Sequence, residues 1–592
     1  MKHIVALGGG VAGMSAAHEL IERGFTVSVY EKQAQYCGGK ARSINYYGRG
    51  TVPYPQPLPG EHGFRFFPGF YRHIIDTMKR IPFKDAQGNT KTVFDNLVPT
   101  DRIMIARYGN TPMVTPAHFP RSKADWEVVF TDMHGMHSGL TKEEIKCFSQ
   151  KVWQLCTSSK TRRENDYEGL GWWQFLEADR FPGTDGKPSP YQSLLVQGLT
   201  RTLVAARAES ASTKTGGDIF LQLIYGMANP MENTDRVLNG PTNERWLNAW
   251  RDDLIQKGVK FVQHAEVISL DCNNQSIQSA QVKIGHADPL SIHADYFILA
   301  VPVEQAAQLM SQDLIKADNT LSNIITLSKS VSWMNGIQFY LSEDVQINRG
   351  HVIYSDTEWA ITSISQMQFW EQYAIQTKGD GRVKGILSVD ISDWFSKGRF
   401  NGKPADECTA QEVADEVWQQ LKASLNVNGQ TILHDDLLVD WYLDRDIVHN
   451  PSINDSKTNL STNREPLLVN SINSWALRPE AYCAIPNLFF AADYVRTYTD
   501  LATMEGANEA ARRAVNSLLD KEGIRNNTCT LWPLKEPAMF QPLKWYDKKR
   551  WEKGLPWTEH YPIWLKFGFG VWTVACTIAD FIRLLAHPQK QK

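Results

Sequence analysis

The sequence has few cysteines, no excess of charge of either sign, and no internal repeat or low-complexity run. Its eight cysteines are scattered, with no CxxC pair. We expect no signal peptide, because a glycine motif begins only seven residues from the first Met. These features favour a reducing, cytoplasmic compartment. Lys and Arg number 62 against 65 Asp and Glu, a formal charge of −3, so no global field attracts nucleic acid.

The bulk composition indicates a large folded protein. At 592 residues the chain is too long for one ordinary domain, so we expect two or more. Hydrophobic residues make up 42% and charged residues 21%, which is ordinary for a globular protein. Extensive disorder is therefore not expected.

The N-terminal stretch predicts a βαβ unit that binds a dinucleotide. Residues 3–7 form a buried strand pattern, and the G-x-G-x-x-G spacing follows. Gly8 allows the tight turn, Gly10 lets the backbone approach a pyrophosphate, and Gly13 lets the next helix pack closely on the sheet. That helix directs its positive N-terminal end at the phosphates. The alternative, an ordinary tight turn, explains fewer of these features.

An acid closes the second strand of this unit. Residues 26–30 read as that strand, and Glu31 stands 18 residues beyond Gly13. A carboxylate there can accept both hydroxyls of an adenosine ribose, and it argues against a 2′-phosphate.

The next segment points to the kind of dinucleotide. Gly38 and Gly39 make a flexible turn, and Lys40 and Arg42 bring positive charge near the expected pyrophosphate. The pattern ExxxxxGG[KR]xxS, from Glu31 to Ser43, resembles the flavin-binding start of the amine oxidase and phytoene desaturase superfamily. The resemblance implies FAD.

Two later segments resemble the same superfamily. Residues 246–271 contain a helix, Gly258 and a strand ending near Val267, where the family packs backbone against adenine. In residues 487–519 a buried strand ends at Asp493, and a helix begins around Met504 to Ala507. The resemblance implies that this acid binds the ribityl or pyrophosphate part of FAD and that the helix end faces the flavin ring. No cysteine stands in the ATMEGA stretch, so we expect noncovalent FAD.

The cofactor-binding residues implied in this way come from the front, the middle and the back of the chain. They are Gly8, Gly10, Val11, Ala12, Gly13, Glu31, Lys32, Gly38, Gly39, Lys40, Arg42, Val267, Asp493, Met504 and Ala507.

The fold class that follows is α/β, with a discontinuous Rossmann-like FAD-binding domain, an inserted α+β substrate domain and a C-terminal helical extension. The FAD-binding domain is expected in residues 1–75, 225–305 and 470–522. The substrate domain is expected in 76–224 and 306–469, where it forms the roof of the pocket, and 523–592 is the extension.

Candidates for catalysis lie in the segment that the resemblance places beside the flavin ring. Glu61, His62 and Arg65 could orient substrate or move a proton, and Trp475 could line the substrate face. The alternative is that His62 and Arg65 bond loop carbonyls or the pyrophosphate, and that Trp475 is core packing. We expect no metal site, because the two histidines of HGMHSG, residues 134–139, lack further ligands nearby.

The C-terminal tail differs from the rest in charge. From residue 544 to 592 it carries nine Lys or Arg and four Asp or Glu, interleaved with tryptophans. Its apolar stretch, 567–579, has 13 residues, fewer than the roughly 20 needed to span a bilayer. We expect peripheral contact with the inner face of a membrane or a hydrophobic entrance to the site. A helix packed on the body or on a second subunit is the alternative.

The function expected from these features is FAD-dependent dehydrogenation or desaturation of a small hydrophobic, isoprenoid-like substrate, by hydride transfer to flavin N5. The electron acceptor would be a quinone or O2. The first alternative is an amine oxidase or amino-acid oxidase that uses O2, with Trp475 and Tyr494 as an aromatic cage. The second is a redox-neutral flavoenzyme, an isomerase or dehydroxylase.

Overall fold

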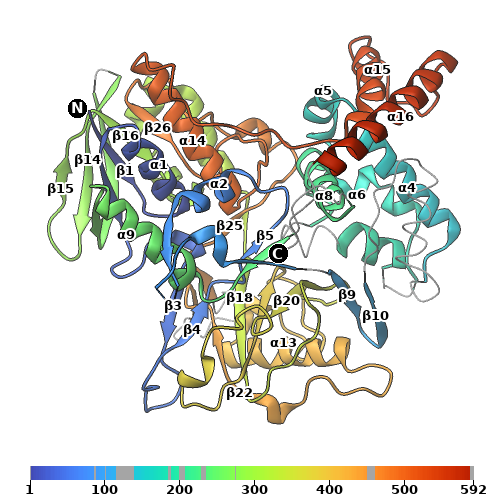
Figure 1. Cartoon of the computed structure of the whole chain (residues 1–592), viewed down its shortest axis with the longest axis horizontal. Coiled ribbons are helices and arrows are strands. Elements are labelled where there is room, and N and C mark those ends of the chain that lie inside the picture. The colour runs from blue at the N-terminus through green and yellow to red at the C-terminus, as the bar shows by residue number, and fades with distance from the viewer. Residues whose placement is uncertain are drawn as a thin grey trace.

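A five-stranded parallel sheet lies at one end of the molecule (Figure 1). We describe it from a computed structural model, which covers residues 2–85, 88–100, 102–114, 139–184, 188–198, 207–228, 235–273, 275–449 and 461–586. Every neighbouring pair of strands in this sheet is parallel. Its strands, in spatial order, are β12 (Lys260–Gln263), β2 (Thr26–Glu31), β1 (His3–Leu7), β16 (Tyr296–Leu299) and β26 (Leu488–Phe490).

The chain enters this sheet from three segments that are far apart in sequence. β1 and β2 come from the front of the chain, β12 and β16 from its middle, and β26 from near its end. The predicted strands at 3–7 and 26–30 are confirmed. The last strand ends at Phe490 and not at Asp493 as predicted, because residues 491–493 leave the sheet toward the cavity described below.

Helices cover the parallel sheet and join its ends. α1 (Val11–Ile21) follows β1 and packs on α14 (Met504–Lys521), so the first and last parts of the fold share one hydrophobic core. The predicted start of a helix at Met504 is confirmed. α2 (His73–Arg80) and α9 (Asn248–Gln256) pack beside them.

A separate antiparallel sheet of three strands follows β12. The strand predicted to end near Val267 is two strands, because His264 adopts a positive φ of 56° and turns the chain out of the parallel sheet. Val267 therefore lies near the start of a strand. The three strands are β13 (Ala265–Asn273), β14 (Ser276–Ile284) and β15 (Leu290–Ile292).

A seven-stranded mixed sheet forms a second layer (Figure 1). α13 (Ala410–Leu425) covers one face, where Val413 and Val417 pack on apolar side chains of the strands. Its strands, in spatial order, are β10 (Asn110–Val114), β9 (Met104–Arg107), β19 (Val352–Tyr354), β20 (Ile361–Ser365), β21 (Gly385–Ile391), β18 (Asn335–Leu341) and β22 (Leu438–Leu443).

A helical lobe with its own hydrophobic core lies at the opposite end from the parallel sheet (Figure 1). It joins residues from the first half of the chain to the C-terminal extension. Its main helices are α4 (Lys142–Thr157), α5 (Lys160–Arg162), α6 (Trp172–Phe175), α8 (Thr213–Ala228), α15 (Gln541–Trp551) and α16 (Ile563–Ala586), with π-helical turns at Arg163–Tyr167 and Tyr191–Gln197.

Short elements connect these layers. The small strands are β3 (Ser43–Tyr46), β4 (Leu58–Glu61), β5 (Phe66–Phe67), β6 (Pro82–Lys84), β7 (Thr90–Thr92), β8 (Leu97–Pro99), β11 (Arg236–Leu238), β17 (Val331–Ser332), β23 (Ile447–His449), β24 (Ser461–Asn463) and β25 (Leu467–Leu468). The connecting helices are α10 (Val303–Leu309), α11 (Gln312–Ala317) and α12 (Ser322–Leu327).

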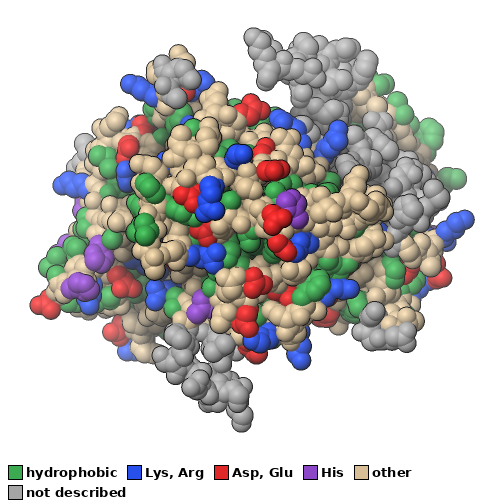
Figure 2. Space-filling view, turned by 90° about the horizontal axis from the view of Figure 1, so that it is seen from below, with side chains coloured by type: hydrophobic (Ala, Val, Ile, Leu, Met, Phe, Trp, Pro, Cys, Tyr) green, Lys and Arg blue, Asp and Glu red, His purple; other side chains and the backbone are tan. Residues whose placement is uncertain are grey.

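The surface carries charges of both signs. Figure 2 shows acidic and basic side chains intermixed over the face seen from below. Within the described ranges, no helix combines the length and the apolar character that crossing a bilayer requires. The HGMHSG histidines lie outside the described residues.

Candidate active site

One large cavity, about 570 Å³, runs between the parallel sheet, the seven-stranded sheet and the helical lobe. Most of the residues predicted to bind the cofactor line it. They are Gly8, Gly10, Val11, Ala12, Glu31, Lys32, Gly38, Gly39, Lys40, Arg42, Val267, Asp493, Met504 and Ala507. The candidates His62 and Arg65 line it as well.

Glycine in this turn lets the backbone lie close to the cavity, because a side chain here would collide with neighbouring backbone atoms. A Cβ on Gly13 would stand 1.9 Å from the carbonyl oxygen of Gly8, which explains why α1 can start so close to β1. Gly13 itself does not line the cavity. Gly38 has a φ of 104°, a left-handed conformation, and its N–H donates to the carbonyl of Gly9 at 2.8 Å. The two glycine loops therefore lie against each other at the start of α1.

The end of the cavity beside the two glycine loops fits a pyrophosphate and a ribose. Among the described residues, no side chain caps the first turn of α1, and that turn contains no acid, so its N–H groups remain for an anion. Glu31 is buried and receives the N–H of Gly9 at 2.8 Å and of Gln33 at 2.7 Å. Burial raises the pKa of Glu31, and these two N–H groups oppose the rise. Its oxygens keep lone pairs for ribose hydroxyls.

The start of α14 closes the other end of this binding surface. Thr503 caps the helix, with its Oγ1 accepting the N–H of Gly506 at 3.1 Å. Glu505, the acid of the first turn, is directed to α2, where it accepts the N–H groups of His73 and Ile74. The positive end of α14 thus stays available to electron-rich atoms of a flavin.

Arg65 and Arg42 hold the segment that follows the glycine pair. Arg65 donates to the carbonyls of Lys40 at 3.0 Å and Ala41 at 3.2 Å. Arg42 contacts Asp446 at 2.5 Å and donates to the carbonyl of Gly39 at 2.8 Å. These contacts of Arg65 agree with the alternative interpretation, in which it binds loop carbonyls. Arg65 also lines the cavity.

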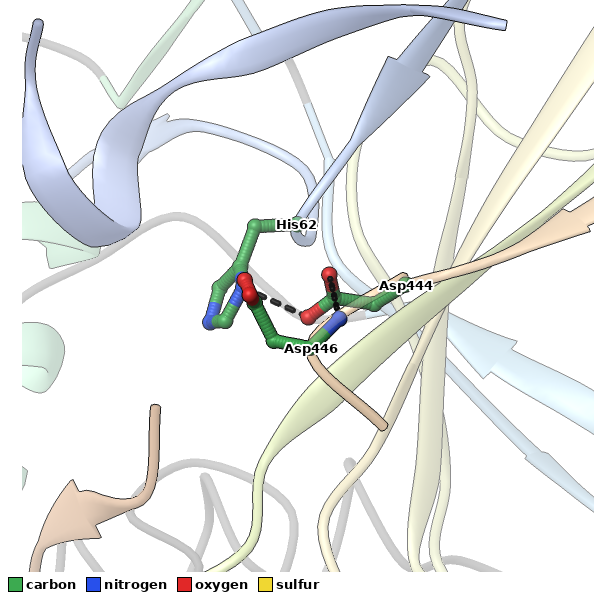
Figure 3. Close-up of side chains that lie close together, drawn as sticks. All are labelled: His62, Asp444 and Asp446. Atoms are coloured by element: carbon green, nitrogen blue, oxygen red, sulfur yellow. Dashed lines mark hydrogen bonds and ion pairs between the residues drawn. The ribbon is translucent and has the colours of Figure 1, made fainter. Parts of the chain in front are cut away.

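His62, which lines the cavity, belongs to a His–Asp–Asp cluster (Figure 3). Nδ1 of His62 lies 2.6 Å from Oδ2 of Asp444 and 3.8 Å from Oδ2 of Asp446. Burial opposes the charged imidazole, but Asp444 outweighs it and raises the pKa of His62 to about 9. Burial also opposes charge on Asp446, yet His62 and Arg42 lower its pKa to about 2. His62 therefore presents an imidazolium to the cavity at neutral pH.

The same three residues have a spacing that could hold a metal ion. However, Arg42 and His62 already supply the positive charges next to Asp446 and Asp444. The two acids are therefore balanced by these two side chains without a metal ion.

Asp390 is a cavity-lining acid that the sequence analysis did not identify. It lies on β21, where Leu387, Val389 and Ile391 face the core under α13, so the alternating strand directs Asp390 to the opposite face. Burial raises its pKa to about 7, and Arg65 and His62 limit the rise. An acid that interrupts the apolar strand GILSVDI was the available signal.

His351 is a second residue that the sequence analysis missed. It lies between Phe64 and Phe66, with ring centroids 5.2 and 5.3 Å away. Burial lowers the pKa of His351 to about 4, so it is neutral and adds to an aromatic wall. No sequence signal distinguished it from other histidines.

Two predicted catalytic residues do not line the cavity. Both Glu61 oxygens are bonded to Thr242, at 2.9 Å from its N–H and its hydroxyl, and burial raises the pKa of Glu61 to about 7. Trp475 donates from Nε1 to Asp500 at 2.8 Å. Neither residue is among those that line the cavity. Tyr494 is fully buried and is not among them either.

The parallel sheet, the paired glycine loops and the ribose-directed acid define an FAD-dependent oxidoreductase. Residues 11–519 match the sequence profile of flavin containing amine oxidoreductases. The chain belongs to that family.

One characterised relative is the flavin-dependent L-tryptophan oxidase RebO of Lentzea aerocolonigenes. It is 35% identical over 95 residues, which is 16% of this chain and 19% of the relative. The match thus spans about a fifth of that relative's length.

Solved structures share the fold at low sequence identity. An oxidoreductase from Methanosarcina mazei has a TM-score of 0.55 and 12% identity, covering 88% of this chain and 100% of its own. Putrescine oxidase bound to putrescine has a TM-score of 0.54 at 11% identity, and cyclohexylamine oxidase from Brevibacterium oxydans IH-35A has 0.54 at 10%. Each of these two covers 88% of this chain and 99% of its own.

Proposed function

We propose that this protein oxidises the carbon–nitrogen bond of an amine that carries an apolar body. The observation that supports this most directly is Asp390, a buried acid on the cavity wall whose pKa is raised to about 7. Bound FAD supplies the two-electron acceptor, which O2 or a quinone then reoxidises.

Amine oxidation needs a proton acceptor before the carbon–hydrogen bond breaks. An amine is protonated at neutral pH, and its nitrogen lone pair must be free to assist the departure of a hydride from the neighbouring carbon. A carboxylate with a pKa near 7 can take that proton. Arg65 and His62 keep part of the Asp390 population ionised, because both carry positive charge nearby.

The rest of this wall suits an apolar group. The same cavity is also lined by apolar side chains, namely Phe64, Phe66, Met334, Ile219 and Leu223. Burying an apolar substrate body against them stabilises the bound complex and excludes water from the reacting atoms. The names of the tryptophan, putrescine and cyclohexylamine oxidases also support an amine substrate.

A second candidate is the dehydrogenation of a hydrophobic, isoprenoid-like substrate. The apolar residues on the cavity wall favour it, as does the exposed apolar surface of the helical lobe described below. Against it, a hydrocarbon has no proton to give up, so this candidate leaves the cavity-lining acid Asp390 without a role in the reaction.

Anaerobic mixing of the FAD-loaded protein with each substrate class separates these candidates. We expect primary amines with apolar bodies to bleach the flavin absorption band, and isoprenoids in detergent to leave it unchanged. Bleaching by isoprenoids alone would overturn the amine proposal. Turnover of a substrate with no bleaching at any time would point to the redox-neutral alternative.

A further inference from the structure

The outer face of α16 exposes a continuous apolar stripe. We define this outer face as Ile563, Phe567, Val571, Val574 and Ile578, whose spacing of three or four residues places them on one side of the helix. Ile563 is 86% exposed and Phe567 76%. Trp564, beside them, is 58% exposed. Nothing in the described part of the chain covers these side chains.

The opposite face of α16 is already used in packing. Leu565 is buried in the core of the helical lobe, and Phe569 and Cys576 pack against that core. Trp572 donates from Nε1 to the carbonyl of Ala538 at 2.8 Å. A surface helix normally turns a polar face to water once its apolar face is packed. Here both faces are apolar, so the outer face calls for an apolar environment.

Lys566 and Trp564 border the outer face on α16 by helical spacing, and further lysines and a tryptophan are exposed on or just after α15. Lys548, Lys549, Lys553 and Lys566 are exposed on α15, on the turn after it and on α16. Trp545, on α15, is 53% exposed. Lysines beside an apolar stripe, with tryptophans at its edge, match the acyl chains and the anionic headgroups of a lipid surface.

The helical lobe that carries α16 also forms one wall of the cavity. Ile219 and Leu223 of α8 line the cavity, whereas Phe220 and Leu221 of the same helix pack in the lobe core that Leu565 of α16 completes. Figure 1 shows α15 and α16 at the outer edge of this lobe, away from the parallel sheet. A lipid surface bound to α16 would therefore lie on the same side of the cavity as α8.

We propose that the outer face of α16 docks this protein on an anionic lipid bilayer, with the helix lying in the plane of the interface. The flanking lysines add attraction to the headgroups. This inference is independent of the substrate class.

Charge favours a bilayer over a second copy of this chain. In a two-fold dimer whose axis passes near Lys566 of α16, the two copies of this lysine would approach each other and repel. An anionic surface attracts Lys548, Lys553 and Lys566, whereas Lys549 is already paired with Glu552 at 2.8 Å. The two occupants also differ in the measurements below.

Flotation of the full-length, FAD-loaded protein with phosphatidylcholine vesicles, with and without phosphatidylserine, tests the proposal. We expect the protein to float with the anionic vesicles and to bind the neutral vesicles more weakly. Phe567→Glu with Val571→Glu should reduce the partition coefficient by at least about tenfold, because two apolar side chains leave the lipid. Lys548→Gln and Lys566→Gln should each reduce it by about fivefold on the anionic vesicles.

Leu290→Glu with Val52→Glu is the matched control, because both side chains are exposed and apolar but lie on other surfaces. We expect this control to float like the unaltered protein. Unchanged thermal unfolding of the α16 variants would show that they fold.

Several outcomes would overturn the proposal. They are no flotation, equal flotation of the unaltered protein and the Phe567→Glu, Val571→Glu variant, or equal binding to neutral and anionic vesicles. A different result would assign the outer face to a second copy of the chain. In that case the protein would sediment as a dimer and would not bind vesicles, and Phe567→Glu with Val571→Glu would convert the dimer to a monomer.

Discussion

Among single side chains, Asp390 carries the first prediction. If it accepts the amine proton, the rate of flavin reduction should rise as the pH passes through about 7, because the carboxylate forms in that range. Asp390→Asn should abolish this pH dependence and slow flavin reduction by about 10²–10⁴-fold. Stopped-flow absorbance of the flavin band over a pH series measures both effects.

Glu61→Gln provides the comparison, because Glu61 also has a pKa of about 7 but faces Thr242. If the pH dependence of flavin reduction disappears in this variant and persists in Asp390→Asn, the proton acceptor is Glu61.

The stability of the protein gives a second test of Asp390. The folded pKa of Asp390 lies above its ordinary value of 3.8, so ionisation costs the native protein stability as the pH rises toward about 7. The stability that Asp390→Asn gains relative to the unaltered protein should therefore grow between about pH 4 and about pH 7 and level off above it.

Glu31 carries a prediction about cofactor affinity. Glu31→Ala removes the acceptor for ribose and also leaves the Gly9 and Gln33 N–H groups without their partner. We expect FAD binding to weaken by about 1.5–3 kcal/mol, or roughly 10- to 150-fold in Kd. Titration of the apoprotein with FAD measures the change. Glu31→Gln keeps a carbonyl acceptor and should lose less FAD affinity than Glu31→Ala. Equal FAD affinity of the two variants and the unaltered protein would contradict the ribose contact.

Among helices and strands, the junction of β1 and α1 leaves no room for a side chain at Gly13. Gly13→Ala would place a methyl group 1.9 Å from the Gly8 carbonyl oxygen, so α1 must move off the sheet. We expect a loss of about 1–3 kcal/mol in stability and weaker retention of FAD. The control is Gly216→Ala in α8, where the new methyl group meets nothing within 4 Å and helix propensity improves. Equal thermal stability and FAD content in both variants would contradict this packing argument.

For the chain as a whole, the C-terminal extension is part of the helical lobe. Asp547 of α15 lies 2.9 Å from Arg162 and also accepts the N–H of Ser159 at 2.8 Å, and all three residues are buried. Leu565 of α16 completes the same core. Deleting residues 544–592 would remove the Asp547 partner of Arg162, which keeps Asp166, and would expose the lobe core, a loss of about 3–5 kcal/mol.

We therefore expect the truncated protein to unfold at a lower temperature and to be cut by proteases within residues 139–184. Phe567→Glu, which changes only the surface of α16, should keep the stability of the full-length protein. A truncated protein with unchanged melting and protease resistance would show that the lobe folds without its C-terminal helices.

The parts of the site that sequence reasoning found depend on short-range patterns. Gly8, Gly10, Glu31 and the helix start at Met504 are each recognised within a few tens of residues, because turn geometry and strand alternation act locally. Asp390, Asp444 and His351 were missed. Each belongs to an otherwise ordinary segment, and its importance arises only when the seven-stranded sheet stands beside the glycine loops.

The amino-acid order alone determined the dinucleotide fold and its glycine loops, because backbone that must approach a phosphate requires glycine at defined positions. The tertiary structure decided which acid faces the cavity and at what pKa, since burial and neighbouring charge come from segments hundreds of residues apart. It also decided which face of α16 remains uncovered. Helical periodicity shows that a helix has two apolar sides, but only packing shows which of them the protein has already filled.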